Sequence, residues 1–420
     1  MLKTSAVLAG LLSVSYGWTP AVLARALNSR ATSSSCASLS GSFNITSDLT
    51  KTLHPENAVY HADKGALYMS LLYESRVGIL PCGSNKIESV IEFKNLTESF
   101  VEGTSGNSTS PKPLDLSDDP TLHASGLELD LPRNRLTVIV EAGDAFDSFG
   151  QNIEGPNYVI SVDLETKQPV FVVDLTKSAP KDYGGIQDIE HDDDGNIFVV
   201  WTWGGRLTRI VPDPKKPVVT EWYRSEKPKP AKALTGIAKF DSTTLLVADQ
   251  TDAQLYRFST KDESVREKVQ IADGGRLDDT VDGIYLPPKY GGCVILVSDD
   301  FNGTWVLSSN DQWKTATKHG VVPSEYGPNG STTATVEVEG SIFAINEFFG
   351  AKDVKSFPLT DITDRVEALL SNTTLSCGKG SNGGSNGTAP TQSGPLVSGS
   401  SKTGATLSMF AGMFFAVLLL

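Results

Sequence analysis

One pattern returns six times along this 420-residue chain, and it constrains the fold more than any single motif does. Each copy contains a short polar entrance, a strand, a turn, a second strand ending in small or acidic residues, and a more exposed strand. The copies start near Pro55, Ala124, Ile186, Leu234, Val281 and Thr333. The intervals of 69, 62, 48, 47 and 52 residues match four-stranded blades of about 40–50 residues, with loop insertions in the first two.

The connections between the expected strands support the same fold. The stretches "DKG", "DDDG" and "KYGG" supply the Asp and Gly residues that tight turns between antiparallel strands need. No long stretch of helical period lies between them. Because radial repetition protects the exposed edges of an all-β chain, we predict one all-β domain, a six-bladed β-propeller over residues 36–377.

Both ends of the chain resemble targeting segments. The start, "MLKTSAVLAGLLSVSYG", predicts a secretory signal within residues 1–24, cleaved after Gly17 or Ala24. Residues 378–404 are rich in Gly, Ser and Thr and have too few apolar groups to offset their ordering entropy, so we expect this tract to be disordered. Residues 405–420 form an apolar tail with no charged residue after it.

Small residues, a polar spacer and a terminal apolar tail together predict a glycosylphosphatidylinositol (GPI) anchor. Ser393 fits the spacer length best as the attachment residue, with Asn386 and Ser398 as alternatives. The other interpretation is a C-terminal transmembrane helix, but the tail is shorter than the roughly 20 residues that a span needs. We therefore expect a secreted protein held at the extracellular face of the cell membrane or in the cell wall by its lipid anchor.

Sequons and cysteines fit the same route. Asn-x-Ser/Thr sequons that predict N-glycosylation occur at Asn44, Asn95, Asn107, Asn302, Asn329, Asn372 and Asn386. The four cysteines, Cys36, Cys82, Cys293 and Cys377, lack zinc-type spacing and predict two disulfides. A clasp between Cys36 and Cys377 would join the ends of the repeat region, although three connectivities remain open.

Charge limits the partners. The net charge of −14 opposes binding to nucleic acid and to anionic membrane surfaces. We expect a monomer whose partner is a small molecule or a component of a host or of the cell wall.

The stretch "GGIQDIEHDDDGNIFVVW", residues 184–201, concentrates acidic groups at a strand and its following turn. Asp192, Asp193, Asp194 and Gly195 are typical of a hairpin turn. Asp188 instead lies on the expected innermost strand, where the entrances of all blades converge at one channel mouth. Polar residues at matching entrances and at the ends of the second strands are His54, Asn57, His123, Ser125, Gln187, Thr235, Thr333, Thr335, Glu141, Asp299, Asp300, Asn346 and Glu347.

Two kinds of site can be built from these residues. Ca²⁺ takes six to eight oxygen ligands, and the first candidates are Glu56, Asp188, Asp249 and Asp282. Ca²⁺ is the one cofactor that this set suggests, and the alternative is a polar channel bonded to water without metal. The catalytic candidates are His54, His123 and His191, each of which could equally be a structural histidine. The chain has no nucleophile elbow, P-loop, Rossmann glycine pattern or HExxH motif.

Several motifs resemble a known group. The stretches "FNITSDLTKTLHPEN", "ALYMSLLY", "GGIQDIEHDDDGNIFVV", "GIYLPPKYGGCVILVSDD", "DQWKTA" and "FPLTDIT" are similar, in this order, to the secreted propeller family of the fungal core trichothecene gene cluster. The likeness runs from Phe43 to Thr363 and implies a filamentous-fungal origin, a six-bladed fold and an association with virulence on plants. The tract beyond Cys377 departs from that pattern and favours a wall or membrane position.

A looser likeness connects the chain to calcium-dependent lactonase and gluconolactonase propellers. There, a glutamate at the first blade entrance and Asn or Asp residues of later blades hold the metal, and Glu56, Asp188, Asp249 and Asp282 occupy similar places here. The leading interpretation is an accessory protein of virulence or secondary metabolism that binds its ligand at the channel mouth. The alternatives are a Ca²⁺-dependent lactonase-like hydrolase and a propeller that assists cyclisation in natural-product biosynthesis.

Overall fold

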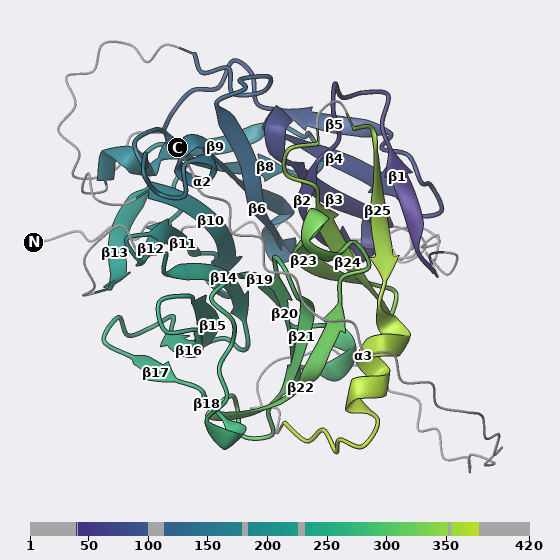
Figure 1. The fold of residues 1–420 in the computed structure, drawn as a ribbon. Helices are drawn as coiled ribbons and strands as arrows, with labels where there is room; N and C mark the ends of the chain where they lie inside the picture. The colour runs from purple at the N-terminus through teal and green to yellow at the C-terminus, as the bar shows by residue number, and fades with distance from the viewer. Residues whose placement is uncertain are drawn as a thin grey trace, which may run out of the picture. The chain divides into compact units, whose positions relative to one another are not determined.

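The computed structural model describes residues 39, 41–99, 113–178, 184–225, 232–351 and 354–377. Six sheets, antiparallel except for one short strand in blade 5, surround a central axis, so the predicted six-bladed β-propeller is confirmed (Figure 1). Within the described part of the chain, no helix is both long and apolar enough to cross a membrane.

Five blades follow the chain order from the innermost strand outward. Blade 1 contains β2 (Pro55–His61), β3 (Ala66–Leu71), β4 (Arg76–Pro81) and β5 (Ser89–Glu92). Blade 2 contains β6 (Leu122–Asp130), β7 (Arg135–Ala142), β8 (Asn157–Asp163) and β9 (Pro169–Asp174). Blade 3 contains β10 (Gly184–His191), β11 (Ile197–Trp203), β12 (Arg206–Val211) and β13 (Val218–Arg224). Blade 4 contains β14 (Leu234–Lys239), β15 (Thr244–Asp249), β16 (Gln254–Ser259) and β17 (Arg266–Lys268). Blade 5 contains β19 (Val281–Tyr285), β20 (Val294–Asp299), β21 (Gly303–Ser308) and β22 (Thr315–Pro323), with β18 (Gln270–Ile271) parallel to β22.

Blade 6 closes the ring with a strand from the other end of the chain. It contains β23 (Ser331–Val338), β24 (Ser341–Glu347), β25 (Ser356–Asp361) and, outermost, β1 (Phe43–Thr46). β1 pairs antiparallel with β25, beside which it lies in Figure 1. Inside, β23 contacts β2, which completes the circle of innermost strands. A strand pair therefore joins the ends of the propeller.

The predicted Cys36–Cys377 clasp is wrong, because Cys377 forms a disulfide with Cys293. After β25 the chain forms α3 (Thr363–Leu370) and then runs along blade 5. Asn310 holds this segment by donating to the Thr374 carbonyl at 3.0 Å and accepting from the Ser376 N–H at 2.7 Å. Cys82 is also disulfide-bonded, and Cys36, the one other cysteine, lies outside the described residues.

The hydrophobic core lies between neighbouring blades. Apolar side chains of one sheet pack against those of the next, as in the cluster of blades 1 and 2 that includes Val77, Ile91, Val138 and Ile160. Alternate residues of the middle strands face the two neighbouring blades, so these strands are apolar on both faces. β11 is buried along its whole length for this reason.

Each inner strand has a bulge near its start. The ladder with the second strand shifts register between Pro55 and Ala58, Ala124 and Leu127, Ile186 and Asp188, Leu234 and Ile237, Val281 and Ile284, and Thr332 and Ala334. Such bulges bend a strand and redirect its side chains. Here they bring the backbones of adjacent blades into close contact at Gly126 and Gly236. A Cβ atom on Gly126 would lie 2.5 Å from the Gln187 carbonyl oxygen, and one on Gly236 would lie 2.4 Å from the Ile284 nitrogen.

The targeting predictions fall largely outside the described residues. The signal segment, the polar tract and the apolar tail lie there, as do the three attachment candidates and the sequons at Asn107 and Asn386. The remaining sequon asparagines are all exposed: Asn44, Asn95, Asn302, Asn329 and Asn372. N-glycosylation and anchoring stay predictions.

Candidate functional site

The candidate site lies at the end of the channel where the inner strands begin, which we call the upper mouth. Each inner strand runs antiparallel to the second strand of its blade, so the first residue of one faces the last residue of the other. Leu122 pairs with Ala142, Leu234 with Asp249, and Val281 with Asp299. Side chains from strand starts and strand ends therefore meet at this mouth, as the sequence predicts.

Glu56 marks the centre of the upper mouth. Its side chain is buried, its residue is 7% exposed, and its Oε2 atom has no hydrogen-bond partner. Burial raises the pKa of Glu56 well above its usual value, and the carboxyl groups of Asp282, Asp188, Glu141 and Glu347 raise that pKa further. Since these four acids come from blades 5, 3, 2 and 6, five blades direct carboxyl groups towards the channel axis.

Asp188 connects two blades beside Glu56. Its Oδ1 accepts the Ile189 N–H at 2.9 Å, and its Oδ2 accepts the Ile237 N–H of blade 4 at 3.1 Å. Burial raises the pKa of Asp188 to about 7, although the two N–H groups oppose the shift. Glu190, two residues further along β10, forms a similar bridge to blade 4: it accepts the Lys239 N–H at 2.8 Å.

The other acids of the mouth also have partners. Glu141 accepts from the Ser125 hydroxyl at 3.0 Å, and Asp282 accepts from the Gln187 amide. Burial raises the pKa of Glu141 and of Asp282 well above their usual values. Burial raises the pKa of Asp300 to about 6, and the Lys232 ammonium opposes this rise.

Two of the three histidine candidates lie at this mouth. The Nδ1 atom of His54 is hydrogen-bonded to Glu347, so the pair ties blade 1 to blade 6. The Tyr73 ring lies edge-on between His54 and His123, with ring centroids 4.7 Å and 5.0 Å away. Burial lowers the pKa of His123.

His191 lies elsewhere, because it ends β10 rather than starting it. Its Nε2 is 2.9 Å from the Thr137 hydroxyl of blade 2, and burial lowers its pKa to about 4. A strand advances about 3.3 Å per residue, so the eight residues of β10 carry His191 to the other end of the channel. The structure therefore places His191 apart from His54 and His123.

The four candidate metal ligands do not assemble into a cation site. Asp249 is paired with Arg266 at 2.8 Å and accepts the Thr251 N–H at 2.9 Å. Both oxygens of Asp188 accept backbone N–H groups. Across the described ranges, no group of three or more His, Cys, Asp or Glu side chains is arranged to hold a metal ion. These residues therefore do not fit Ca²⁺, which takes six to eight oxygens.

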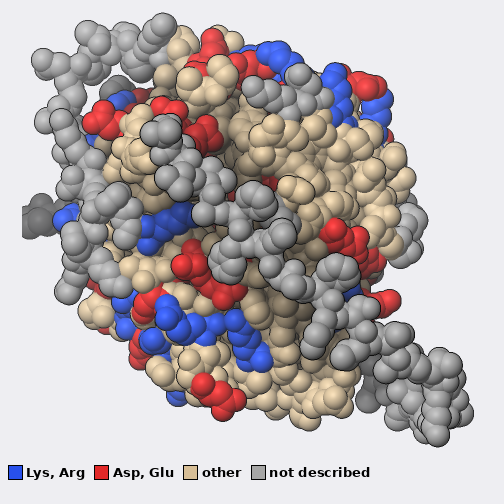
Figure 2. Space-filling view, viewed as in Figure 1, with Lys and Arg blue, Asp and Glu red and all other residues tan. Residues whose placement is uncertain are grey.

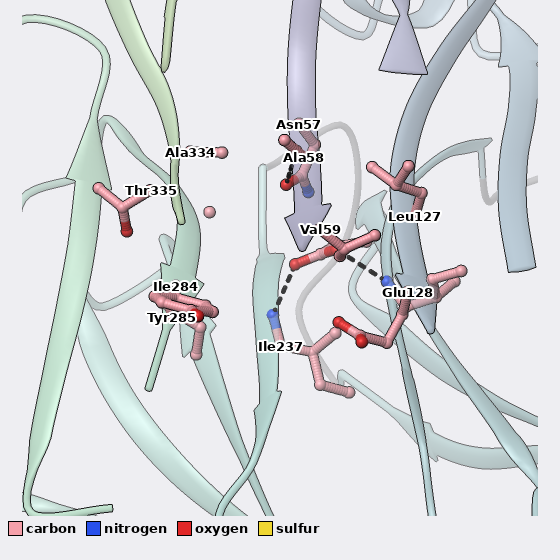
Figure 3. Close-up of a pocket in the computed structure, with 13 residues that line it drawn as sticks. Asn57, Ala58, Val59, Leu127, Glu128, Ile237, Ile284, Tyr285, Ala334 and Thr335 are labelled. Atoms are coloured by element: carbon pink, nitrogen blue, oxygen red, sulfur yellow. Dashed lines mark hydrogen bonds between the residues drawn. The ribbon is translucent and has the colours of Figure 1, made fainter. Parts of the chain in front are cut away.

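Below the upper mouth the channel holds a cavity of about 40 Å³, lined by residues of all six inner strands. Figure 3 shows Glu128 and Thr335 on opposite sides of it. This space admits water molecules, whose share of liquid volume is about 30 Å³ each, but no organic molecule. A ligand of the mouth must bind from the outer side.

Sequence reasoning missed two contributors to the mouth, Tyr73 and Lys232. Tyr73 belongs to the 3-10 turn Leu72–Glu74 between β3 and β4, where one aromatic residue carries no periodic signal. Lys232 lies in a lysine- and proline-rich connection, and its ammonium lowers the pKa of both Asp282 and Asp300. Nothing in the sequence of that connection distinguishes Lys232 from its other lysines.

Comparison with known proteins agrees with the fold and with the motifs. No family model matches the chain. The chain is 27% identical to "Trichothecene biosynthesis protein 14" of Trichoderma arundinaceum over 337 residues, which cover 76% of this chain and 87% of that protein. It is 26% identical to "Core trichothecene cluster (CTC) protein 14" of Fusarium sporotrichioides, over 76% of this chain and 84% of the relative.

Among solved structures, the Malassezia sympodialis allergen Mala s 1 matches with a TM-score of 0.60 and 20% identity, over 77% of this chain and 96% of the allergen. That likeness supports the fold alone. The resemblance predicted from the motifs is confirmed: over about three quarters of its length, this six-bladed propeller is similar to the protein 14 of fungal trichothecene clusters.

Proposed function

We propose that this chain is a secreted, surface-held binding propeller of fungal secondary metabolism, and that its upper mouth binds an organic ligand. The names of the two fungal relatives support the link to secondary metabolism. The Cys293–Cys377 disulfide is typical of an oxidising compartment and supports secretion.

One observation carries the binding site: Glu56 is buried among four other carboxyl groups and yet has an oxygen without a partner. Buried charges in proteins are normally paired, and groups with strongly shifted pKa values cluster at functional sites. If these carboxyl groups served only to stabilise the fold, apolar residues of similar volume would stabilise it better.

The alternatives find less support in the geometry. A lactonase-like mechanism needs a metal, and the candidate ligands do not fit one. Assistance of a cyclisation needs a chamber for the reacting molecule, and the channel cavity of about 40 Å³ is too small. The His54–Glu347 pair could orient a general base, but it also spans the junction of the first and last blades, which accounts for it structurally.

The binding site is tested with the protein purified from a filamentous-fungal host. Native mass spectrometry after incubation with a culture extract should show a retained small molecule with the wild-type protein. A Glu56→Gln, Glu141→Gln double variant should lose that species, whereas Glu263→Gln, a change in an exposed turn, should keep it. Retention of the species by the double variant would locate binding elsewhere.

Surface attachment is tested separately. We expect phosphatidylinositol-specific phospholipase to release the protein from fungal membranes. Truncation after Gly378 should give a soluble secreted domain, because all six blades end before that residue. A truncated protein that stays with the membrane would contradict the anchor.

A further inference from the structure

We infer that the upper mouth receives a primary ammonium group at the end of a slender apolar chain, and that the Glu56 carboxylate is its main acceptor. This inference rests on the proposed binding function and adds the chemical class of the ligand.

The first step is the charge balance around Glu56. The groups that act most strongly on its carboxyl are the acids Asp282, Asp188, Glu141 and Glu347. Lys232, the nearby cation, acts instead on Asp282 and Asp300. The mouth thus has an excess of acid at its centre. Without a cation the Glu56 carboxyl keeps its proton, and a cation from outside allows it to ionise and pair.

The second step is the supply of acceptor atoms. Three carboxyl oxygens at this mouth are buried without a hydrogen-bond partner: Glu56 Oε2, Glu347 Oε2 and Asp300 Oδ1. The remaining acids are engaged by backbone N–H groups or by side chains, as described for Asp188 and Glu141. An ammonium group has three N–H donors and no acceptor, which matches a set of acceptors. It needs far fewer oxygens than Ca²⁺ does.

The third step concerns shape. Backbones approach closely at Gly126 and Gly236, and only about 40 Å³ is open beneath. The channel beneath the acids therefore admits no ring or branched group, and a ligand whose ammonium reaches the acids must leave its apolar body outside.

The fourth step is the surface at the upper end of the propeller. Phe149, Phe301 and Phe349 are 73%, 57% and 53% exposed, and we call them the aromatic rim. Each lies in the connection from the second to the third strand of its blade, in blades 2, 5 and 6, so all three are at the upper end. On the face drawn in Figure 2, acidic and basic side chains are interspersed among uncharged ones. An acidic centre with an apolar rim suits a cation on an apolar body.

Three matched probes test the inference: n-hexylamine, n-hexanol and hexanoate, titrated into the full mature protein and followed by saturation-transfer NMR. The amine should bind at least tenfold more tightly than the alcohol, and hexanoate should not bind. Glu56→Gln should reduce the affinity for hexylamine to that for hexanol, and Glu263→Gln should leave all three affinities unchanged. If Glu56→Gln does not fold, Asp300→Asn, at a half-buried position, should reduce the amine preference at least threefold.

A further arm identifies the source of the ammonium. A blocked Phe-Lys-Phe peptide is compared with its norleucine counterpart, because a lysine side chain carries the same group as a free alkylamine. Preference for the lysine peptide over both its counterpart and hexylamine indicates a protein partner, and preference for hexylamine indicates a small amine.

Two outcomes would overturn the inference in distinguishable ways. Equal binding of hexylamine and hexanol, with both lost in the Glu56→Gln, Glu141→Gln double variant, would keep the binding function and refute the ligand class. Failure of every probe, together with no retained species from a culture extract, would refute both.

Discussion

Asp188 and the Asp192–Asp194 turn lie within seven residues on blade 3, but the first is part of the channel and the second is a hairpin turn. Asp188 is buried on the channel and accepts N–H groups from two blades, and burial raises its pKa to about 7. Asp194 is exposed and bonded to Lys261 at 2.7 Å, which lowers its pKa. The same residue type thus has a raised pKa in one place and a lowered pKa in the other.

Asp192 differs from its two neighbours. It is 2% exposed, and its Oδ1 accepts the N–H groups of Asp194 at 3.0 Å and Asn196 at 2.9 Å. Its Oδ2 accepts the Asn196 side-chain amide at 2.8 Å. The comparison shows that burial and hydrogen bonds from N–H groups, rather than a place in an acidic run, decide whether a carboxylate contributes to stability.

The largest effect is expected for Asp188→Ala. The change leaves the Ile189 and Ile237 N–H groups buried without acceptors, which should lower the free energy of unfolding by about 3–5 kcal/mol. Asp188→Asn retains one acceptor oxygen, so its free energy of unfolding should fall clearly less than that of Asp188→Ala. Urea denaturation of both variants measures this, and a wild-type midpoint for Asp188→Ala would remove the bridging role.

A pH profile should show the next largest effect. Folded Glu56, Glu141, Asp188, Asp282 and Asp300 have raised pKa values, so the folded state keeps protons that the unfolded chain loses near pH 4. Stability must therefore fall as the pH rises from about 4 to 7.

His191 acts in the opposite direction, because its folded pKa of about 4 lies below that of the unfolded chain. Its contribution is complete above about pH 6.5 and is lost as the pH falls towards 4. Burial also lowers the pKa of His61, His123 and His319. The carboxyls with raised pKa values outnumber these histidines, so the free energy of unfolding should be at least about 2 kcal/mol higher at pH 5 than at pH 7.5. Urea titrations at both values test this, and a higher stability at pH 7.5 would contradict the assignment.

Asp192→Ala should have an intermediate effect. Loss of the turn bonds to Asp194 and Asn196 should cost about 1–2 kcal/mol and leave ligand binding at the mouth unchanged. A combined loss of binding and stability would mean that the turn also supports the channel.

The smallest effects are expected for Asp193→Ala and Asp194→Ala. Both side chains are exposed and form surface ion pairs, with Lys239 and Lys261 respectively. Such pairs contribute little, so the melting temperature and the mouth affinities should match the wild type. A clear drop for either variant would erase the contrast with Asp188.

The periodicity of the chain was enough to predict the propeller. The expected blade starts at Pro55, Leu234 and Val281 coincide with the first residues of β2, β14 and β19. Strand alternation and turn residues are local properties, so one sequence reveals them. The same reasoning places the acids of the upper mouth, because every inner strand starts at the same end.

What the sequence by itself determined is therefore the repeat, the strand directions and the set of residues at each strand start. The tertiary structure decided how those residues are used. Asp249 faces Arg266 instead of the mouth, Cys377 meets Cys293 across an 84-residue separation, and Lys232 reaches the acids. Each of these depends on how distant segments pack and on which charges share a buried space, and local pattern carries no information about either.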